Sequence, residues 1–365
     1  MIDRPVLNVR AIRAIAVEVP LRFVLGTSAA AVHAAPLLLV DVDTEQGITG
    51  RTYLFCYVPA AAPAIISLLG AVEAAVKGKA IVPVELWALL SKRFRLIGVQ
   101  GIVRMAMSAF DTACWDALAI AANVPLVEYL GGSMRPVRAY NSCGLGLMPA
   151  AALADEADKL LEDGFRALKL RLGYPTLAED MAALEAVRAR VPAAIEIMAD
   201  FNQALSVEEA LVRGRALDSA GIAWIEEPIR HDDYRGCATL AHELATPIQI
   251  GENFSEPHAM AEALEVHACD YVMPDLERIG GVTGWKNAAA LAAERAVPMS
   301  SHLFPEVSAH LLAVTPTAHW LEYVDWAGTI VEEPLQIVDG NAIIPPRPGN
   351  GLTWDKKAVA RYRMK

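Results

Sequence analysis

Apolar runs of strand length alternate with helix-like stretches through the second half of the chain. Helix-like stretches such as residues 150–162, 177–190 and 207–220 separate most of the strand-like runs. About eight β-α units within about 190 residues predict a closed TIM (β/α) barrel and not an open sheet. No GxGxxG motif follows the first strand, which disfavours a dinucleotide-binding fold. The strand-like runs begin near Val137, Arg166, Ile195, Ala223, Pro247, Tyr271, Val297 and Leu321.

The region before the barrel predicts a mixture of strands and helices. Residues 11–19 and 36–42 predict strands. Between them, the Gly/Ser/Ala-rich segment Leu21 to Ala35 predicts a mobile loop. Residues 104–122 predict one long helix. We therefore expect an α+β domain over residues 1–132.

The other boundaries follow from where the repeat of strands and helices begins and ends. We expect the barrel over residues 133–328. Residues 329–365 contain Pro345-Pro346 and show no strand–helix repeat. We expect this C-terminal segment to return and pack on the N-terminal domain.

The chain is acidic and rich in apolar residues. It has 365 residues, 54% of them hydrophobic, and a formal net charge of −11. The length and composition allow a large core. The acidic balance, without a Lys/Arg-rich run, argues against nucleic acid as a partner. An anionic substrate must therefore be bound by local cations or a metal ion, not by the overall field of the protein.

Cysteine usage and hydropathy bear on the compartment. The five cysteines are scattered and form no CxxC motif, so we expect reduced thiols and neither disulfides nor zinc. The N-terminus has no apolar signal core, and we expect a cytoplasmic protein.

The mean hydropathy of +0.31 raises the question of a membrane span. The most apolar stretch, residues 59–76, contains two prolines and Glu73, which predicts a buried helix and no membrane partner.

Nearly every predicted barrel strand ends in a polar residue. In a TIM barrel, the C-terminal ends of the strands form the face that carries the active site. Buried polar groups are costly without partners, so their repeated placement at one face predicts a functional site. In chain order these residues are Ser142, Lys169 and Arg171, Asp200 and Asn202, Glu226, Glu252, Asp275, His302 and Glu322.

Three of these residues, Asp200, Glu226 and Glu252, offer carboxylate oxygens and no thiolate. Hard oxygen ligands favour Mg²⁺ or Mn²⁺ over zinc. Each carboxylate alone would be explained as a helix N-cap or a solvated loop residue. Their position on consecutive strands, after a pair of cations, predicts a shared metal site instead.

Lys169 and Arg171 lie two residues apart on one predicted strand, so their side chains project to the same side. Two cations in one interior are costly unless an anion lies there. The pair is explained either by ion pairing with carboxylates of neighbouring strands or by substrate binding and proton transfer. Lysine serves as a base when a nearby cation or metal lowers its pKa, whereas arginine, with a pKa above about 12, normally does not.

His302 is the candidate general base. Asp275 ends the preceding strand, and a neighbouring carboxylate fixes the imidazole tautomer and raises its basicity. The seven other histidines are expected to be core or surface groups. Glu322 ends the last strand. It is explained either as a general acid or hydrogen-bond donor to the substrate, or as a salt-bridged carboxylate at the rim.

Longer motifs add a resemblance that covers nearly the whole chain. They are Tyr53-Leu54-Phe55-Cys56-Tyr57, Asp200-Phe201-Asn202-Gln203, Trp224-Ile225-Glu226-Glu227-Pro228, Gly251-Glu252-Asn253, Met273-Pro274-Asp275, Ile279-Gly280-Gly281-Val282-Thr283-Gly284-Trp285, Met299-Ser300-Ser301-His302-Leu303-Phe304 and Ser308-Ala309-His310-Leu311-Leu312. In this order they resemble the mandelate racemase / muconate lactonizing enzyme family of the enolase superfamily, and most closely its mandelate racemases.

The resemblance implies a fold, a cofactor and a chemistry. The fold is a modified TIM (β/α) barrel with an α+β capping domain, built from the N-terminal region and the C-terminal tail. Family members bind Mg²⁺, chelate a substrate carboxylate and remove the proton α to it through an enediolate. We therefore expect a small-molecule carboxylate as the substrate. Because the family is commonly oligomeric, we also expect a homo-oligomer.

By position, the resemblance also implies roles for individual residues. Asp200, Glu226 and Glu252 resemble the metal ligands. Lys169, Ser142 and Asn202 resemble groups around the carboxylate and the metal. His302 with Asp275 resembles the base dyad, and Glu322 the acid that hydrogen-bonds the carboxylate. The Leu21–Ala35 loop, with Phe55 and Tyr57, resembles the cap over the substrate.

Arg171 departs from the racemase pattern. In mandelate racemases the corresponding strand carries Lys-x-Lys, and the second lysine is the base on the face of the substrate opposite the histidine. The leading hypothesis is Mg²⁺-dependent, racemase-like 1,2-proton transfer on a 2-hydroxycarboxylate, supported by the chain-wide resemblance and the apolar cap. An acid-sugar dehydratase, with His302 as both base and acid, is the alternative that Arg171 supports. A non-catalytic binding protein of the same fold is the second alternative.

Overall fold

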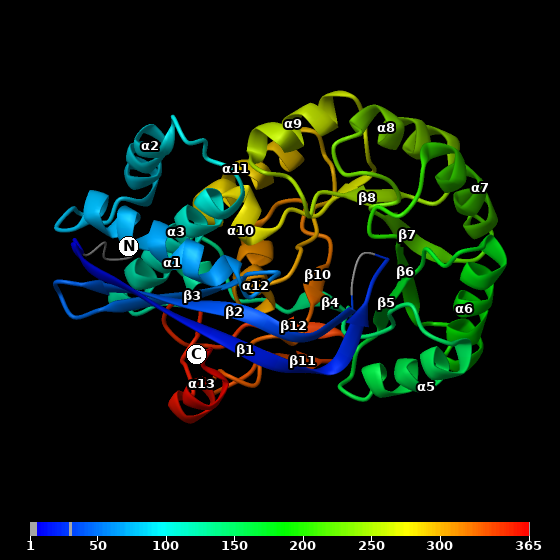
Figure 1. Cartoon of the computed structure of the whole chain (residues 1–365), viewed down its shortest axis with the longest axis horizontal. Helices are drawn as coiled ribbons and strands as arrows, with labels where there is room; N and C mark the ends of the chain where they lie inside the picture. The colour runs from blue at the N-terminus through cyan, green and yellow to red at the C-terminus, as the bar shows by residue number, and fades with distance from the viewer. Residues whose placement is uncertain (1–5, 29–30, 365) are drawn as a thin grey trace.

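The structure, a computed structural model, describes residues 6–28 and 31–364. An antiparallel sheet begins the chain, with strands in the order β1 (Val9–Gly26), β2 (Ala31–Thr44) and β3 (Thr49–Phe55). Figure 1 shows these strands and the helices after them on one side of the molecule, and the barrel on the other. The helices that follow are α1 (Ala61–Val76), α2 (Pro83–Phe94), α3 (Gly101–Ala121) and α4 (Leu126–Tyr129).

Helix α3 joins the N-terminal sheet to the barrel. It contacts β3 on one side and the barrel helices α10 (Leu276–Ile279) and α11 (Gly281–Glu294) on the other. Its side chains are buried almost all round, as its apolar sequence requires. At Gly50 of β3, an added Cβ would lie 1.9 Å from the carbonyl oxygen of Ala113, so this close approach of strand and helix requires glycine.

The predicted loop from Leu21 to Ala35 is largely strand. β1 extends to Gly26 and β2 starts at Ala31, with Leu25 paired to Val32 and Gly26 to Ala31. The prediction was wrong for the described residues, because small residues favour loops locally whereas antiparallel pairing of the two consecutive strands decides the conformation here; residues 29–30 of the predicted loop lie outside the described residues. Figure 1 shows this long β1–β2 arm, drawn in blue, running from the capping side towards β5 of the barrel.

The barrel strands pair in parallel in chain order, and β10 closes the ring by pairing with β4. Below the site, the interior is filled by Tyr140, Ala167, Met198, Trp224 and Trp320. The strands are β4 (Val137–Asn141), β5 (Ala167–Arg171), β6 (Glu196–Asp200), β7 (Ile222–Glu226), β8 (Ile248–Ile250), β9 (Tyr271–Val272) and β10 (Leu321–Tyr323).

The strand expected near Val297 is irregular. Single bridges join Met299 to its neighbours on both sides, and another joins Asp275 to His302. The backbone N–H of Ser300 donates to the β9 side and that of Ser301 to the β10 side. These alternating bonds hold the barrel together without a regular ladder.

Helices surround the barrel on its outside (Figure 1). Helix α6 begins with a capping box of Thr176 and Glu179, and α7 with one of Ser206 and Glu209. Among the described residues, no helix is both long and apolar enough to cross a membrane. Besides α10 and α11, these helices are α5 (Ala150–Leu161), α6 (Leu177–Arg190), α7 (Val207–Leu217), α8 (Tyr234–Glu243), α9 (Pro257–Glu265) and α12 (Pro305–Val314).

The C-terminal segment contacts both parts of the molecule. Its strands β11 (Gln336–Val338) and β12 (Asn341–Ile343) form a hairpin, and β12 pairs with barrel strand β4. The chain then crosses to the N-terminal sheet, where Trp354 Nε1 donates to Asp41 at 2.8 Å. After helix α13 (Lys356–Tyr362), the backbone N–H of Met364 donates to the carbonyl of Ala16.

Candidate active site

Lys169 is the centre of the buried charges at the C-terminal ends of the strands. Its side chain is almost fully buried, and Nζ contacts Glu226 Oε1 directly. Nζ also lies 2.6 Å from Glu322 Oε1 and 3.2 Å from Asp200 Oδ2. Burial alone would lower the pKa of Lys169, but the three carboxylates outweigh it and raise the pKa. Lys169 is therefore a firmly protonated ammonium that gathers carboxylates from three strands.

Asp200 and Glu226 lie side by side on the neighbouring strands β6 and β7. Asp200 accepts hydrogen bonds from the backbone N–H and the side-chain amide of Asn202 at 2.8 and 3.1 Å. Glu226 Oε2 accepts from Trp224 Nε1 at 3.0 Å and from Gln249 Nε2 at 3.2 Å. Burial, together with nearby carboxylates, raises the pKa of Glu226 to about 7 although Lys169 opposes the shift. These two carboxylates are thus fixed in direction by neutral donors around one cation.

The residues present suit a divalent cation by their chemistry. Asp200, Glu226 and Glu252 supply carboxylate oxygens, and Asn202 Oδ1 is buried without a hydrogen-bond partner among the described residues. In the part of the chain that the structure describes, no three His, Cys, Asp or Glu side chains converge closely enough to form a ready metal cage. Asp200 and Glu226 face Lys169, whereas Glu252 lies 3.3 Å from His302. The donor set fits Mg²⁺ by its chemistry, although Glu252 now contacts His302 and not Lys169.

His302 and Asp275 form the predicted pair. His302 Nδ1 lies 2.7 Å from Asp275 Oδ2, which leaves Nε2 facing Glu252 at 3.3 Å and Glu322 at 3.9 Å. Asp275 also caps α10 by accepting the backbone N–H groups of Glu277 and Arg278. Burial would lower the pKa of His302, but the carboxylates of Glu252, Glu322 and Asp275 raise it to about 9.

Glu322 links Lys169 to a second chain of polar groups. Ser142 donates to Glu322 Oε1 at 2.7 Å, and Arg171 Nη2 donates to Ser142 Oγ at 3.0 Å. Arg171 Nη1 donates to the carbonyl of Gly144 at 2.7 Å. Burial would raise the pKa of Glu322, but Lys169 and His302 lower it to about 2. In this arrangement Glu322 accepts hydrogen bonds, and Arg171 is bound to the loop after β4.

The predicted cap residues stack in one aromatic group. The Phe55 ring lies 4.4 Å from Tyr57 and 3.9 Å from Trp326, between ring centroids. Phe55 is buried and Tyr57 is 39% exposed. At the tip of the β1–β2 arm, Ser28 donates to the carbonyl oxygens of Phe201 and Asn202 at 3.3 Å each. The capping side therefore contacts the barrel at two places, through Phe55 at Trp326 and through Ser28 at the end of β6.

The sequence analysis did not single out Trp326, Glu277 or Arg278, and it included Ser28 only as part of the Leu21–Ala35 cap segment. Glu277 is buried and accepts the backbone N–H of Phe55 at 3.1 Å, so it ties the cap to the helix after Asp275. A charged residue in the short stretch after a strand is typical of a solvated surface. The one available signal was position, since both charged residues directly follow Asp275 at the functional end of the barrel.

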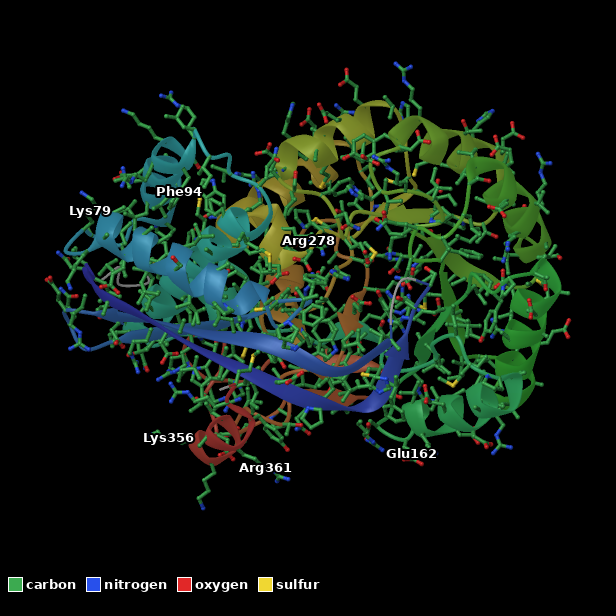
Figure 2. All side chains as sticks on the ribbon, viewed as in Figure 1. Lys79, Phe94, Glu162, Arg278, Lys356 and Arg361 are labelled. Atoms are coloured by element: carbon green, nitrogen blue, oxygen red, sulfur yellow. The ribbon has the colours of Figure 1, made fainter. Side chains whose placement is uncertain are left out.

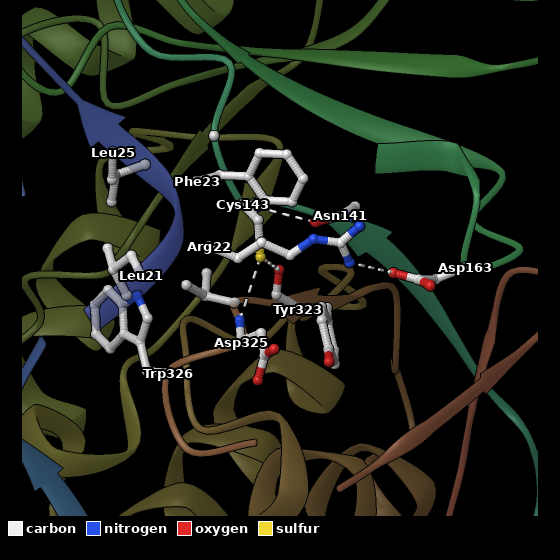
Figure 3. Close-up of a pocket in the computed structure, with 12 residues that line it drawn as sticks. Leu21, Arg22, Phe23, Leu25, Asn141, Cys143, Asp163, Tyr323, Asp325 and Trp326 are labelled. Atoms are coloured by element: carbon white, nitrogen blue, oxygen red, sulfur yellow. Dashed lines mark hydrogen bonds and ion pairs between the residues drawn. The ribbon is translucent and has the colours of Figure 1, made fainter. Parts of the chain in front are cut away.

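A cavity of about 40 Å³ lies between the β1–β2 arm and the ends of β4 and β10 (Figure 3). Leu25 and Trp326 line it together with Cys143, which accepts the backbone N–H of Asp325 at 3.3 Å. Cys143 and Tyr323 follow Ser142 and Glu322 in sequence and face the opposite way, because side chains alternate along strands. Burial raises the pKa of the Cys143 thiol to about 12, so it stays protonated and is no nucleophile here.

Comparison with known proteins agrees with this geometry. The model of the "Enolase C-terminal domain-like" family matches residues 152–358. The model of the "Mandelate racemase / muconate lactonizing enzyme, N-terminal domain" family matches residues 9–131. The chain belongs to the mandelate racemase / muconate lactonizing enzyme family of the enolase superfamily. Membership confirms the predicted fold, a capping domain over a TIM barrel, and places the chain among enzymes.

Three members of the superfamily show its range of ligands. L-talarate/galactarate dehydratase of Salmonella typhimurium is 34% identical over 274 residues, 75% of this chain and 68% of that protein. An enolase of the alpha proteobacterium BAL199, solved with bound magnesium, is 43% identical with a TM-score of 0.96, over 98% of this chain and 100% of that one. An enolase of Bradyrhizobium, solved with magnesium and mandelic acid, is 42% identical with a TM-score of 0.94 over 100% of both chains.

Proposed function

We propose that this protein, with Mg²⁺ bound, removes the α-proton of a 2-hydroxycarboxylate substrate. The substrate then loses the hydroxyl of its β-carbon as water. The observation that carries the proposal is the His302–Asp275 pair, at 2.7 Å, in a site where Arg171 is hydrogen-bonded to Gly144 and Ser142. One competent base is sufficient for elimination, whereas racemisation needs a base or acid on each face of the substrate.

Asp200, Glu226 and Glu252 would hold the metal, beside Asn202. Mg²⁺ there would act as a Lewis acid, polarising the substrate carboxylate and so making the α-proton more acidic. The magnesium in the two solved relatives supports this cofactor.

The chain's own groups bind the carboxylate and handle the proton. The ammonium of Lys169 and the hydroxyl of Ser142 lie within one hydrogen-bonded group and stabilise the negative charge that develops on the carboxylate oxygens. Neutral His302, the minor form at pH 7 because its pKa is raised to about 9, takes the α-proton at Nε2 while Asp275 holds Nδ1–H and stabilises the imidazolium. The C–H electron pair moves into the enediolate and then expels the β-hydroxyl. Imidazolium protonates the leaving oxygen, and the resulting enol becomes a 2-keto acid.

Racemase-like 1,2-proton transfer is the second candidate. It is favoured by the apolar group of Phe55, Tyr57 and Trp326 above the site, and by the mandelic acid bound in the Bradyrhizobium relative. A polyhydroxylated acid would meet few polar groups in that cap. Arg171 donates to Gly144 from Nη1 and to Ser142 from Nη2, so both terminal nitrogens are already bonded and would have to release a partner to act on the opposite face.

The two reactions are separated by one panel in D₂O with Mg²⁺. Galactarate, L-talarate and both enantiomers of mandelate are followed by NMR for α-deuterium and by a carbonyl reagent for 2-keto acid. We expect 2-keto acid from a dihydroxy acid and α-exchange in one mandelate enantiomer only. Inversion of mandelate would support the racemase, and no reaction with a broad acid library would leave the binding-protein alternative.

The His302→Asn variant tests whether His302 is the general base. It should abolish both exchange and keto-acid formation while leaving Mg²⁺ binding intact, because the metal-ligand carboxylates remain. The matched control is His258→Asn, an exposed histidine paired with Glu262 on α9, which should leave turnover unchanged. Turnover that survives His302→Asn would remove His302 from the mechanism.

A further inference from the structure

Tyr57 lies in a backbone conformation that a bulky residue seldom adopts. Its φ is 59°, and the N–H of Val58 donates to the carbonyl of Cys56 at 2.6 Å, so Tyr57 is the central residue of a γ-turn. A positive φ at a tyrosine is strained, and the residue is 39% exposed. Other contacts must therefore hold this turn at the end of β3.

Two contacts hold the Tyr57 ring. Phe55 lies beneath it at 4.4 Å, and the guanidinium carbon of Arg278 lies 4.6 Å from its centroid on another side. A guanidinium at this distance attracts the face of an aromatic ring. Arg278 belongs to α10 and is partly buried, and Figure 2 labels it near the middle of the view, between the capping side and the barrel.

The same guanidinium reaches the site below. Arg278 Nη1 donates to the carbonyl of Glu252 at 2.9 Å and to Asn253 Oδ1 at 2.8 Å. The backbone N–H of Arg278 donates to Asp275 at 3.0 Å. One residue therefore touches the cap, the turn that carries a proposed metal ligand, and the carboxylate of the base pair.

We propose that Arg278 is a positioning residue that holds Tyr57 over the site and fixes the Glu252–Asn253 turn, so that the cap and the metal side of the site keep one arrangement. It touches no reacting atom; it acts through Tyr57 and Glu252. Its importance for turnover rests on the proposed function, whereas its hold on the cap does not.

A similar contact elsewhere provides the control. Lys286 Nζ on α11 lies 4.7 Å from the ring of Trp115 on α3, which is also a contact between the capping side and the barrel. Neither residue contacts the candidate active site. Arg278→Met and Lys286→Met thus remove comparable cation–ring contacts at one interface, and only the first is expected to change the site.

Hydrogen exchange of the ligand-free protein tests the hold on the cap. Mass spectrometry of overlapping peptides across residues 54–60 separates the Val58 amide, whose hydrogen bond among the described residues is that of the γ-turn, from the Cys56 amide, which donates to Pro36. Arg278→Met should speed its exchange about threefold to thirtyfold, and Lys286→Met should not. Arg278→Lys should restore most of the protection because a cation remains over the ring. Tyr57→Leu should match Arg278→Met, and the double variant should add nothing.

Kinetics test the consequence for the site. With galactarate or mandelate, whichever the wild type converts, Arg278→Met should raise KM about tenfold with kcat changed less than about threefold, because it weakens cap closure more than the chemistry. Lys286→Met should change neither constant.

The proposal is overturned if Arg278→Met leaves the Val58 amide protected, if the double variant is additive, or if Lys286→Met has the same effect on exchange. It is also overturned if KM is unchanged in Arg278→Met while the wild type turns over. If the wild type converts neither acid, the proposed function fails, and the exchange data still decide whether Arg278 holds the cap.

Discussion

Arg171 distinguishes the two candidate reactions, and replacing it by lysine tests both its structural and its chemical role. The arginine is 3% exposed and donates to Gly144 and Ser142 from two different nitrogens. Lysine has one shorter ammonium, which cannot reach both acceptors. A buried hydrogen bond from a charged donor contributes about 1.5–3 kcal/mol, so losing one should lower the free energy of unfolding by about 2–3 kcal/mol.

The assay is urea unfolding of Arg171→Lys beside a matched control, Arg166→Lys. Arg166 begins the same region of chain but pairs with Asp339 on the surface, where both side chains are about 70% exposed. Exposed pairs contribute at most about 1 kcal/mol, so the control should change little. The m-value of each variant is compared with that of the wild type, so that midpoints report stability alone.

The same variant tests the chemistry. If the absence of a second base is what prevents racemisation, Arg171→Lys should gain α-exchange in the second mandelate enantiomer, because a lysine beside other cations can lose its proton. Exchange that stays confined to one enantiomer would mean that the pocket is built for another substrate. Unchanged stability would refute the argument that Arg171 is bound to the loop after β4.

Two further predictions concern the fold. Gly50→Ala should destabilise the protein by about 1–3 kcal/mol or more, because the new Cβ would lie 1.9 Å from the Ala113 carbonyl oxygen. The control is Gly70→Ala in α1, where the added Cβ meets open space and should stabilise the protein by up to about 1 kcal/mol. Equal unfolding midpoints in urea for the two variants would contradict the close packing of β3 on α3. Asp111 is buried and hydrogen-bonded to Thr283, and burial raises its pKa from 3.8 to about 7. The folded state therefore holds this proton more tightly, so the stability it contributes is present below about pH 4 and is lost as the pH rises through 7. Asp111→Asn should make the fall in unfolding free energy between pH 4 and 7 shallower by up to about 1.4 kcal/mol per unit, and an unchanged slope would contradict the shift.

The positions of the charged side chains at the strand ends were predictable from the sequence. Side chains alternate along a strand, and parallel strands end at one face, so Lys169, Asp200, Glu226 and Glu322 had to meet if the barrel formed. The pairing of His302 with Asp275 followed in the same way, because each ends a strand at that face. These predictions depend on local periodicity and on chain order, which the sequence contains.

Other features were not predictable because they depend on partners distant in sequence. The Leu21–Ala35 segment looked like a loop by composition, yet most of its described residues are strand, and Ser28 at the end of this hairpin donates to Asn202, 174 residues later in the chain. Arg278 was not singled out in the sequence, because it contacts Tyr57, which lies more than two hundred residues earlier in the chain.

The sequence by itself determined the class of the fold, the end of the barrel that carries the charges, and the chemical type of the site. Only the tertiary structure decided what those charges are bound to. Lys169 is held protonated by three carboxylates, and Arg171 is committed to Ser142 and Gly144. The physical reason is that periodicity fixes which way a side chain points, whereas its partners, and with them its pKa and its freedom to react, depend on which distant residues the folded chain places within a few ångströms.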